Sequence, residues 1–203
     1  LDPEMEKAAT NKEGVKLTDA IAAAGLTDVP RLRIEDGRYR GYLEAHIEQG
    51  ANLEVAGEQI GVVTAIVGIR AMRFCFHGEQ NHAGTTTMAR RKDAATAMYE
   101  LAHRINQDFP KVADEATVWT MGRVVVEPGA PSIVPGYAEI GLQYRDRNEA
   151  ILDKFEEIAS GIADEIAARG KIKVEYERTR APIRPSEMDE GFQAHFAKAA
   201  ADH

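Results

Sequence analysis

The stretch EQNHAGTTT, residues 79–87, places His82 in a small, glycine-containing turn between a strand-like run and a helix-like run. A histidine in such a turn can point its ring away from the core of its own domain. Thr85 or Thr86 is expected to cap the following helix, whose N-terminus carries partial positive charge. His82 and the free amides would then favour a developing negative oxygen. The alternative is that Asn81 and the threonines serve only the turn and the cap.

A second histidine, His46, lies in EAHIEQG between Glu44 and Glu48, at the end of a segment expected to be a short buried strand over residues 41–50. This setting suits a metal ion, because imidazole is a neutral nitrogen donor and a nearby carboxylate can orient the ring. The alternative is a half-buried strand histidine that only forms hydrogen bonds. No further histidine has metal-ligand spacing with His46, so a complete metal site is not evident.

Two more polar side chains lie on either side of a Pro135-Gly136 turn. Arg145 is on the polar face of an alternating run, where its planar fork could grip a carboxylate with two parallel hydrogen bonds. A solvated sheet arginine is the alternative. Ser132 has a hydroxyl that could reach either a ligand or its own turn. The run RRKD at 90–93 is expected to form the solvated first turns of a helix.

Composition limits the class of protein. The chain has 203 residues, a formal charge of −8 and 44% hydrophobic residues, as an ordinary globular protein of one or two domains does. Nucleic acid is disfavoured as a partner, because no basic stripe with interleaved aromatics opposes the acidic balance. No apolar run approaches the roughly 20 residues that a membrane-spanning helix needs. Cys75 is the only cysteine, which favours a reducing, cytoplasmic compartment.

The elements that must position these residues follow a regular order. We expect a long extended run at 59–79, interrupted by Gly68, and then a helix at 85–109 and strands at 117–127 and 137–146. A helix at 150–170 and a strand at 171–180 complete the series. The order β-α-β-β-α-β over residues 65–180 is the ferredoxin-like arrangement, an antiparallel four-stranded sheet with two helices on one face. The sequence therefore predicts an α/β protein with an inserted α+β module.

The flanking segments are expected to belong to another domain. A helix is predicted at 14–25, ending at Gly25, and a second one from Met188 to Ala201 after two prolines. Residues 1–64 and 181–203 would then be two parts of one domain into which residues 65–180 are inserted. The chain begins with Leu1 and ends in what looks like an interrupted helix, so we expect it to be a piece of a longer protein.

Three segments, taken together, resemble a known family: GYLEAHIEQGANLE, IGVVTAIVGIRAMRFCFHGEQNHAGTTTMARRKDA and SIVPGYAEIGLQYRD. They are similar to the metal-dependent amidases that include N-carbamoyl-L-amino acid hydrolases, allantoate amidohydrolases and β-ureidopropionases. The resemblance implies a metallopeptidase-like catalytic α/β domain that holds two divalent ions, zinc or manganese. It also implies that the inserted ferredoxin-like domain forms a homodimer.

The resemblance assigns roles to particular residues. His46 in HIEQG matches a metal ligand. His82 in NHAGTT matches the histidine that reaches across the dimer to the carbonyl region of the substrate and stabilises the oxyanion, with Gln80 and Asn81 beside it. Arg145 matches the arginine that holds the substrate carboxylate. The implied substrate is thus a small ureido or carbamoyl compound with a carboxylate.

The resemblance bears on two further positions, Arg70 and Ser132. Arg70, in the GIR that enters the small domain, is implied as a further substrate contact. Ser132 stands where many members have asparagine before the V-P-G turn. Because a hydroxyl is shorter and lacks the paired donor and acceptor of an amide, the substrate preference of the family does not transfer with it.

The remaining metal ligands of the family and its general base have no match in this sequence. The chain is therefore expected to supply at most one metal ligand and to be inactive alone. The predicted function of the complete enzyme is hydrolysis of the carbamoyl or ureido C–N bond of an N-carbamoyl-L-amino acid or related ureido acid. The alternatives are an allantoate or ureidoglycolate amidohydrolase, a related metallopeptidase, and a non-catalytic dimerisation or ligand-binding module.

Overall fold

The computed structural model describes residues 2–32 and 34–202, which form two compact units, Leu1–Ala51 and Asn52–His203. The first unit contains two short helices, α1 (Pro3–Ala8) and α2 (Leu17–Ala23). Asp2 caps α1 by accepting a hydrogen bond of 2.8 Å from the Glu4 amide. The predicted helix at 14–25 is present as the shorter α2, and Gly25 follows it with a φ of 68°, as expected for a glycine beyond a helix C-terminus.

The strand predicted at 41–50 is wrong. Residues 41–48 form neither helix nor strand, and residues 41–50 are exposed. An alternating segment becomes a strand only when a neighbouring strand pairs with its backbone and a core covers its apolar side chains. The apolar side chains here instead face solvent, with exposed fractions of 83% for Tyr42 and 76% for Ile47. The segment has the alternation of a strand, but the described part of this unit contains no sheet with which it could pair.

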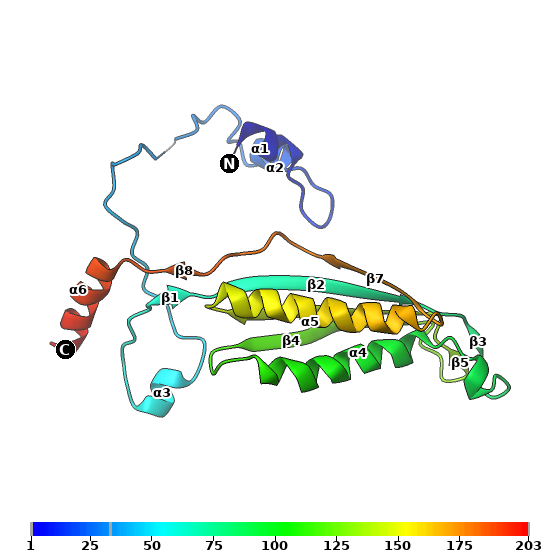
Figure 1. Cartoon of the computed structure of the whole chain (residues 1–203). Coiled ribbons are helices and arrows are strands. Elements are labelled where there is room, and N and C mark those ends of the chain that lie inside the picture. The colour runs from blue at the N-terminus through cyan, green and yellow to red at the C-terminus, as the bar shows by residue number, and fades with distance from the viewer. Residues whose placement is uncertain (1, 33, 203) are drawn as a thin grey trace. The chain divides into compact units, whose positions relative to one another are not determined.

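The second unit is built around a four-stranded antiparallel sheet with the strand order β4-β6-β2-β7. Its strands and the two helices that pack on it are β2 (Gly68–His77), α4 (Ala94–Asp108), β4 (Val118–Glu127), β6 (Tyr137–Asp146), α5 (Glu149–Ala168) and β7 (Lys173–Arg178). Figure 1 shows α4 and α5 running side by side along the sheet. The predicted elements are therefore present in the predicted order, and the mixed α/β class is confirmed.

The core lies between the two helices and one face of the sheet. Four alternate residues of β6 point into it and are almost completely buried: Ala138, Ile140, Leu142 and Tyr144. Phe155 of α5 stacks on Phe109 at a centroid distance of 3.8 Å. Phe109 belongs to η2 (Phe109–Lys111), a short 3-10 helix that continues α4. This aromatic contact holds the end of α4 against α5.

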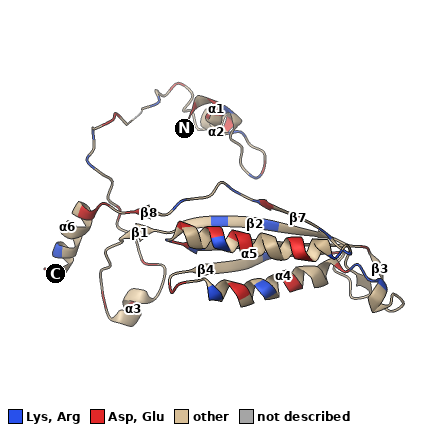
Figure 2. Ribbon diagram, viewed as in Figure 1, with Lys and Arg blue, Asp and Glu red and all other residues tan. Residues whose placement is uncertain are grey.

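Charged residues of both signs are interspersed along α4 and α5 (Figure 2). Arg169 donates to both carboxylate oxygens of Glu100 at 2.7 and 2.6 Å, and Arg104 lies 2.6 Å from Glu165. These pairs link the surfaces of α4 and α5. Because they are largely exposed, their individual contributions to stability are small beside that of the apolar core.

The helix predicted from residue 85 begins later, at Ala94. Asp93 is its N-cap and accepts a hydrogen bond of 3.0 Å from the Thr96 amide. Residues 88–90 form only a short 3-10 helix, η1 (Met88–Arg90). The delay has a backbone cause, because the amide of Glu79 donates to the carbonyl of Lys92 at 2.8 Å and fixes that segment beside the end of β2. The run RRKD is thus not the start of the helix, and that prediction is wrong.

The segments that enter and leave the sheet lie side by side. Here β1 (Ala65–Ile66) pairs with β8 (Ser186–Glu187), and Ile69 forms a bridge with Ile183. Two further helices are α3 (Asn52–Ala56) and α6 (Glu190–Ala201), and the latter confirms the helix predicted after the prolines. In residues 2–32 and 34–202, no helix has the length and apolar content needed to cross a bilayer.

Candidate functional site

The His82 turn lies beyond one end of the sheet. His82 and Asn81 form β3 (Asn81–His82), which pairs antiparallel with β5 (Ile133–Val134) (Figure 1). The Ala83 amide also donates to the carbonyl of Ser132 at 2.8 Å. Residues from two distant parts of the sequence are therefore held together at this end, and His82 is exposed to solvent there.

The imidazole of His82 has a defined hydrogen-bonding role. Its Nδ1 accepts a hydrogen bond of 3.1 Å from the Gly84 amide. A backbone amide can only donate, so Nδ1 carries no proton in this arrangement. The proton of the neutral ring must then be on Nε2, which is left able to donate to a ligand. This is the tautomer that an oxyanion would require.

The residues beside His82 are ordered by a small network. The Asn81 amide nitrogen donates to Glu79 Oε1 at 3.2 Å, and Lys92 Nζ lies 3.1 Å from Glu79 Oε2. The contact with Lys92, with the Asn81 amide as a second donor, holds the pKa of Glu79 below its ordinary value. Gln80 is exposed, and its Cγ packs so close to Gly136 that a Cβ added there would lie 2.7 Å away. The structure thus brings Gln80, Asn81, His82 and Ser132 together.

The predicted cap of this turn is wrong. Neither Thr85 nor Thr86 caps a helix, because α4 begins only after Asp93. The N-terminus of α4 is therefore not the source of the amides next to His82. The hydrogen-bonding capacity of the turn resides instead in the His82 ring itself, oriented by Gly84.

Arg145 lies at the opposite end of β6. It is exposed, and its Nε and Nη2 donate to Gln143 Oε1 at 3.2 and 2.9 Å. Eight residues along the strand separate it from Tyr137, the position next to the His82 turn. At roughly 3.4 Å per residue, this spacing amounts to about 27 Å. Within one chain, Arg145 and His82 do not contact the same small molecule.

Arg70 is the most buried of the predicted site residues. Its side chain is 5% exposed, and its guanidinium lies 3.0 Å from Glu149, 2.5 Å from Asp153 and 3.3 Å from Glu156. These carboxylates all belong to α5, so the arginine fastens β2 to that helix. Its Nε is buried without a hydrogen-bond partner among the described residues. The geometry gives Arg70 a structural role, and the predicted contact with substrate stays a prediction.

His46 lies in the first unit, in the irregular segment that replaces the predicted strand. It is exposed, and its Nδ1 is 2.6 Å from the carbonyl of Ile47. Among residues 2–32 and 34–202, no group of three or more His, Cys, Asp or Glu side chains is arranged to hold a metal ion. These residues therefore do not fit a complete metal centre, and the role of His46 as one ligand stays a prediction.

The structure also shows residues that the sequence analysis missed. Arg91 was expected to be solvated, but its Nε donates to the carbonyl of Thr86 at 3.1 Å and its Nη2 to that of Ala83 at 2.5 Å. Gly78 is equally constrained, since an added Cβ would lie 2.0 Å from the carbonyl oxygen of Lys92. No motif marks these positions, because both act through backbone carbonyls that are close only in the folded chain.

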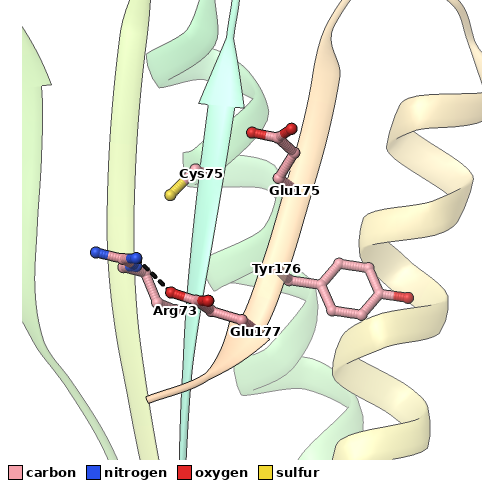
Figure 3. Close-up of a pocket in the computed structure, with 5 residues that line it drawn as sticks. All are labelled: Arg73, Cys75, Glu175, Tyr176 and Glu177. Atoms are coloured by element: carbon pink, nitrogen blue, oxygen red, sulfur yellow. Dashed lines mark hydrogen bonds and ion pairs between the residues drawn. The ribbon is translucent and has the colours of Figure 1, made fainter.

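A separate shallow pocket lies on the face of the sheet away from the helices (Figure 3). Arg73 and Glu177 form an ion pair between β2 and β7, and Cys75 and Glu175 are the next facing pair. Figure 3 shows the Tyr176 ring pointing to the other side, toward α5. This pocket contains none of the predicted site residues. Glu175 pairs with His77 and Lys173, which lie outside its lining.

Comparison with known proteins places the chain among amidases. No model of a known protein family matches it. It is 32% identical to the N-carbamoyl-L-amino acid amidohydrolase of Geobacillus stearothermophilus over 87% of this chain and 44% of that protein. It is 33% identical to the allantoate amidohydrolase of Bacillus subtilis over 75% of this chain and 37% of that protein. The chain thus spans less than half the length of these relatives.

A solved structure gives the same result. The crystal structure of an amidase of the hydantoinase/carbamoylase family from Burkholderia phymatum superposes with a TM-score of 0.89 and 42% sequence identity. The match covers 100% of this chain and 50% of that one. Both the sheet with its helices and the flanking segments are therefore of a kind found in such amidases.

Proposed function

This chain is homologous to the amidases of the hydantoinase/carbamoylase family, and on that premise we propose that it is part of an enzyme that hydrolyses a carbamoyl or ureido C–N bond. The proposed substrate is an N-carbamoyl-L-amino acid or a related ureido acid. The likeness to an allantoate amidohydrolase keeps allantoate as a second candidate. Ser132 lies beside the His82 turn, where its hydroxyl would help to select between them.

His82 is proposed to polarise the bond that breaks. When the carbonyl of the substrate is attacked, negative charge develops on its oxygen. The Nε2–H of His82 is available to donate to that oxygen, because Nδ1 is already occupied by the Gly84 amide. A donor placed in advance stabilises the transition state more than the ground state, since the hydrogen bond strengthens as the charge develops.

Arg145 is proposed to hold the carboxylate of the substrate, through the bidentate geometry that a guanidinium offers. The observation that carries the proposal of a site shared by two chains is the separation of about 27 Å between Arg145 and Tyr137, the residue of β6 next to the His82 turn. A ureido acid is far shorter than this. If both residues serve one substrate, they must come from two chains, and a homodimer with two composite sites follows.

The arrangement of the second unit supports the proposed domains. Numbered along the chain, the strands of the order β4-β6-β2-β7 are the second, third, first and fourth of a β-α-β-β-α-β series, as in a ferredoxin-like sheet. We assign residues 65–180 to this dimerisation domain. Its entry and exit strands, β1 and β8, are paired. That pairing keeps the entry and the exit of the inserted segment next to each other, which supports insertion into a domain made from residues 1–64 and 181–203.

Residues 26–66 are proposed to be covered by further polypeptide in the complete enzyme. Large apolar side chains are exposed throughout this segment, including Leu32 at 95% and Ile34 at 78%. Metal ions, zinc or manganese, would need ligands beyond this chain, to which His46 would contribute at most one. The chemistry that this chain itself supplies is the binding of a carboxylate and the polarisation of a carbonyl. With Cys75 as its only cysteine, it is also proposed to work in the cytoplasm.

The test is turnover of N-carbamoyl-L-amino acids and allantoate by the complete enzyme carrying His82→Ala. Loss of one oxyanion donor should lower kcat by roughly 10²–10³ with the metal content unchanged. The matched control is His103→Ala, which removes an exposed histidine on the surface of α4. Turnover near that of the unmodified enzyme in the His82→Ala variant would refute the assignment.

A further inference from the structure

Arg91 contacts the His82 turn from outside the two strands that carry it. One guanidinium donates to two carbonyls, from Nε to Thr86 and from Nη2 to Ala83, at 3.1 and 2.5 Å. The turn is also closed by a hydrogen bond of 3.1 Å from the Thr86 amide to the carbonyl of His82. The fork of an arginine can occupy both carbonyls at once, and an ammonium group cannot reproduce that geometry.

The carbonyl of Ala83 belongs to the same peptide group as the amide of Gly84. A peptide group is planar and rigid, with its C=O and N–H pointing in opposite directions. Arg91 holds the oxygen end of this plane, and the N–H end donates to His82 Nδ1 at 3.1 Å. Fixing the one end therefore orients the other. The side chain of Arg91 and the ring of His82 are linked through a single peptide plane.

Gly84 leaves the ring room to approach this peptide group closely. A Cβ added at Gly84 would lie 3.2 Å from Cε1 of His82 and 3.5 Å from Nδ1. The ring thus lies directly against the peptide group that orients it. Both the hydrogen bond and this close approach depend on the angle of the Ala83–Gly84 peptide plane.

We propose that Arg91 is a positioning residue for His82, which acts through the Ala83–Gly84 peptide group to keep the proton of the ring on Nε2. The inference rests on the function proposed for His82 but makes a separate claim about this chain. It predicts which tautomer His82 adopts, and the tautomer can be measured without an activity assay.

The first test uses the 203-residue chain and ¹⁵N spectra of the histidine rings at a pH where they are neutral. In the unmodified chain, His82 should show a pyridine-like Nδ1 and a protonated Nε2. In Arg91→Gln, the ring should become a mixture of both tautomers, and the Gly84 amide should exchange with solvent roughly tenfold to a hundredfold faster. Arg90→Gln is the matched control, since the neighbouring Arg90 is exposed.

The second test uses the complete enzyme. Arg91→Gln should lower kcat about tenfold with little change in KM, and Arg91→Lys should recover only part of the loss. In the His82→Ala background, Arg91→Gln should cause no further loss, because a positioning residue has nothing left to position. A merely structural role would instead lower activity in both backgrounds by the same factor.

The outcomes separate the two claims. If His82→Ala leaves kcat unchanged, the proposed function fails, and the spectra still decide the role of Arg91. If His82→Ala lowers kcat but Arg91→Gln leaves both the tautomer and kcat unchanged in a folded chain, the inference about Arg91 alone is overturned. Circular dichroism and the thermal midpoint of each variant establish that it is folded.

Discussion

A mixture of two inactive variants should regain activity if the site is composite. The variants are His82→Ala and Arg145→Ala. Arg145 lies about 27 Å along β6 from Tyr137, the residue of that strand next to the His82 turn. In a composite site, one subunit supplies Arg145 and its partner supplies His82. A heterodimer of the two variants then contains one site with both defects and one site with neither.

The size of the recovery follows from this geometry. When equal amounts of the two variants associate at random, about half of the dimers are heterodimers, and half of their sites are intact. The mixture should therefore reach about one quarter of the activity of the unmodified enzyme. Each variant alone should remain roughly 10²–10³ below the unmodified enzyme, since each lacks a group that acts on the substrate. The recovery should thus exceed the parental activities by more than tenfold.

The assay is turnover of the complete enzyme after the two variants have been co-expressed or dissociated and reassociated. His82→Ala mixed with itself and Arg145→Ala mixed with itself are the reference samples. Arg147→Ala is the matched control, because it removes an exposed arginine just beyond the end of β6. If both groups acted within one chain, every site of the heterodimer would carry one defect. Activity of the mixture no higher than the mean of its parents would then refute the composite site.

The remaining predictions concern stability and are measured by urea unfolding. Gly161→Ala should raise the free energy of unfolding by about 0.5–1 kcal/mol, since an added Cβ in α5 meets nothing within 4 Å. Gly78→Ala should lower the free energy of unfolding by about 1–3 kcal/mol, because its Cβ would lie 2.0 Å from the carbonyl oxygen of Lys92. If the two substitutions changed the free energy of unfolding in the same direction, these two predictions would be contradicted. The hydrogen bond from Arg123 holds the folded-state pKa of the buried Glu139 below its ordinary value. Its contribution to stability should therefore be complete above the ordinary pKa of a glutamate and be lost as the pH falls through the lowered folded-state pKa. Arg123→Gln should show a smaller loss on acidification, and equal acid sensitivity of the two proteins would exclude this cause.

The correctly predicted parts of the fold share one property. Their apolar residues recur at the spacing of a strand or a helix, and neighbouring elements are present to cover those residues. In β6, apolar residues recur at every second position from Ala138 to Tyr144, and these residues form the face toward the helices. In α5, Phe155, Ile162 and Ile166 repeat at helical spacing and are buried. Local pattern and tertiary packing agree in these elements, so the pattern was sufficient.

The predictions failed where the deciding contact was distant in sequence. Residues 41–50 alternate like a strand, yet no strand of the described first unit pairs with them. Residues 85–93 were included in the helix predicted at 85–109, yet a backbone hydrogen bond from Glu79 to Lys92 holds the segment against the end of β2, and the helix begins only at Ala94. Neither partner could be identified from local periodicity. The same holds for Arg91, whose two acceptors are backbone carbonyls with no signature in the sequence.

An extended strand fixes the distance between its two ends as well as the side of the sheet on which each side chain lies. The distance is the constraint that bears most directly on function. The resemblance grouped His82 and Arg145 as parts of one site, whereas the structure places Arg145 at one end of the ten-residue strand β6 and the His82 turn beyond the other end. Side-chain rearrangement cannot shorten a span of about 27 Å, because the paired neighbours β2 and β4 hold β6 extended along its whole length. If both residues act on one small substrate, the flexibility of a single chain cannot bring them together. Either a second copy of the chain supplies the missing half of the site, or one of the two assignments is wrong.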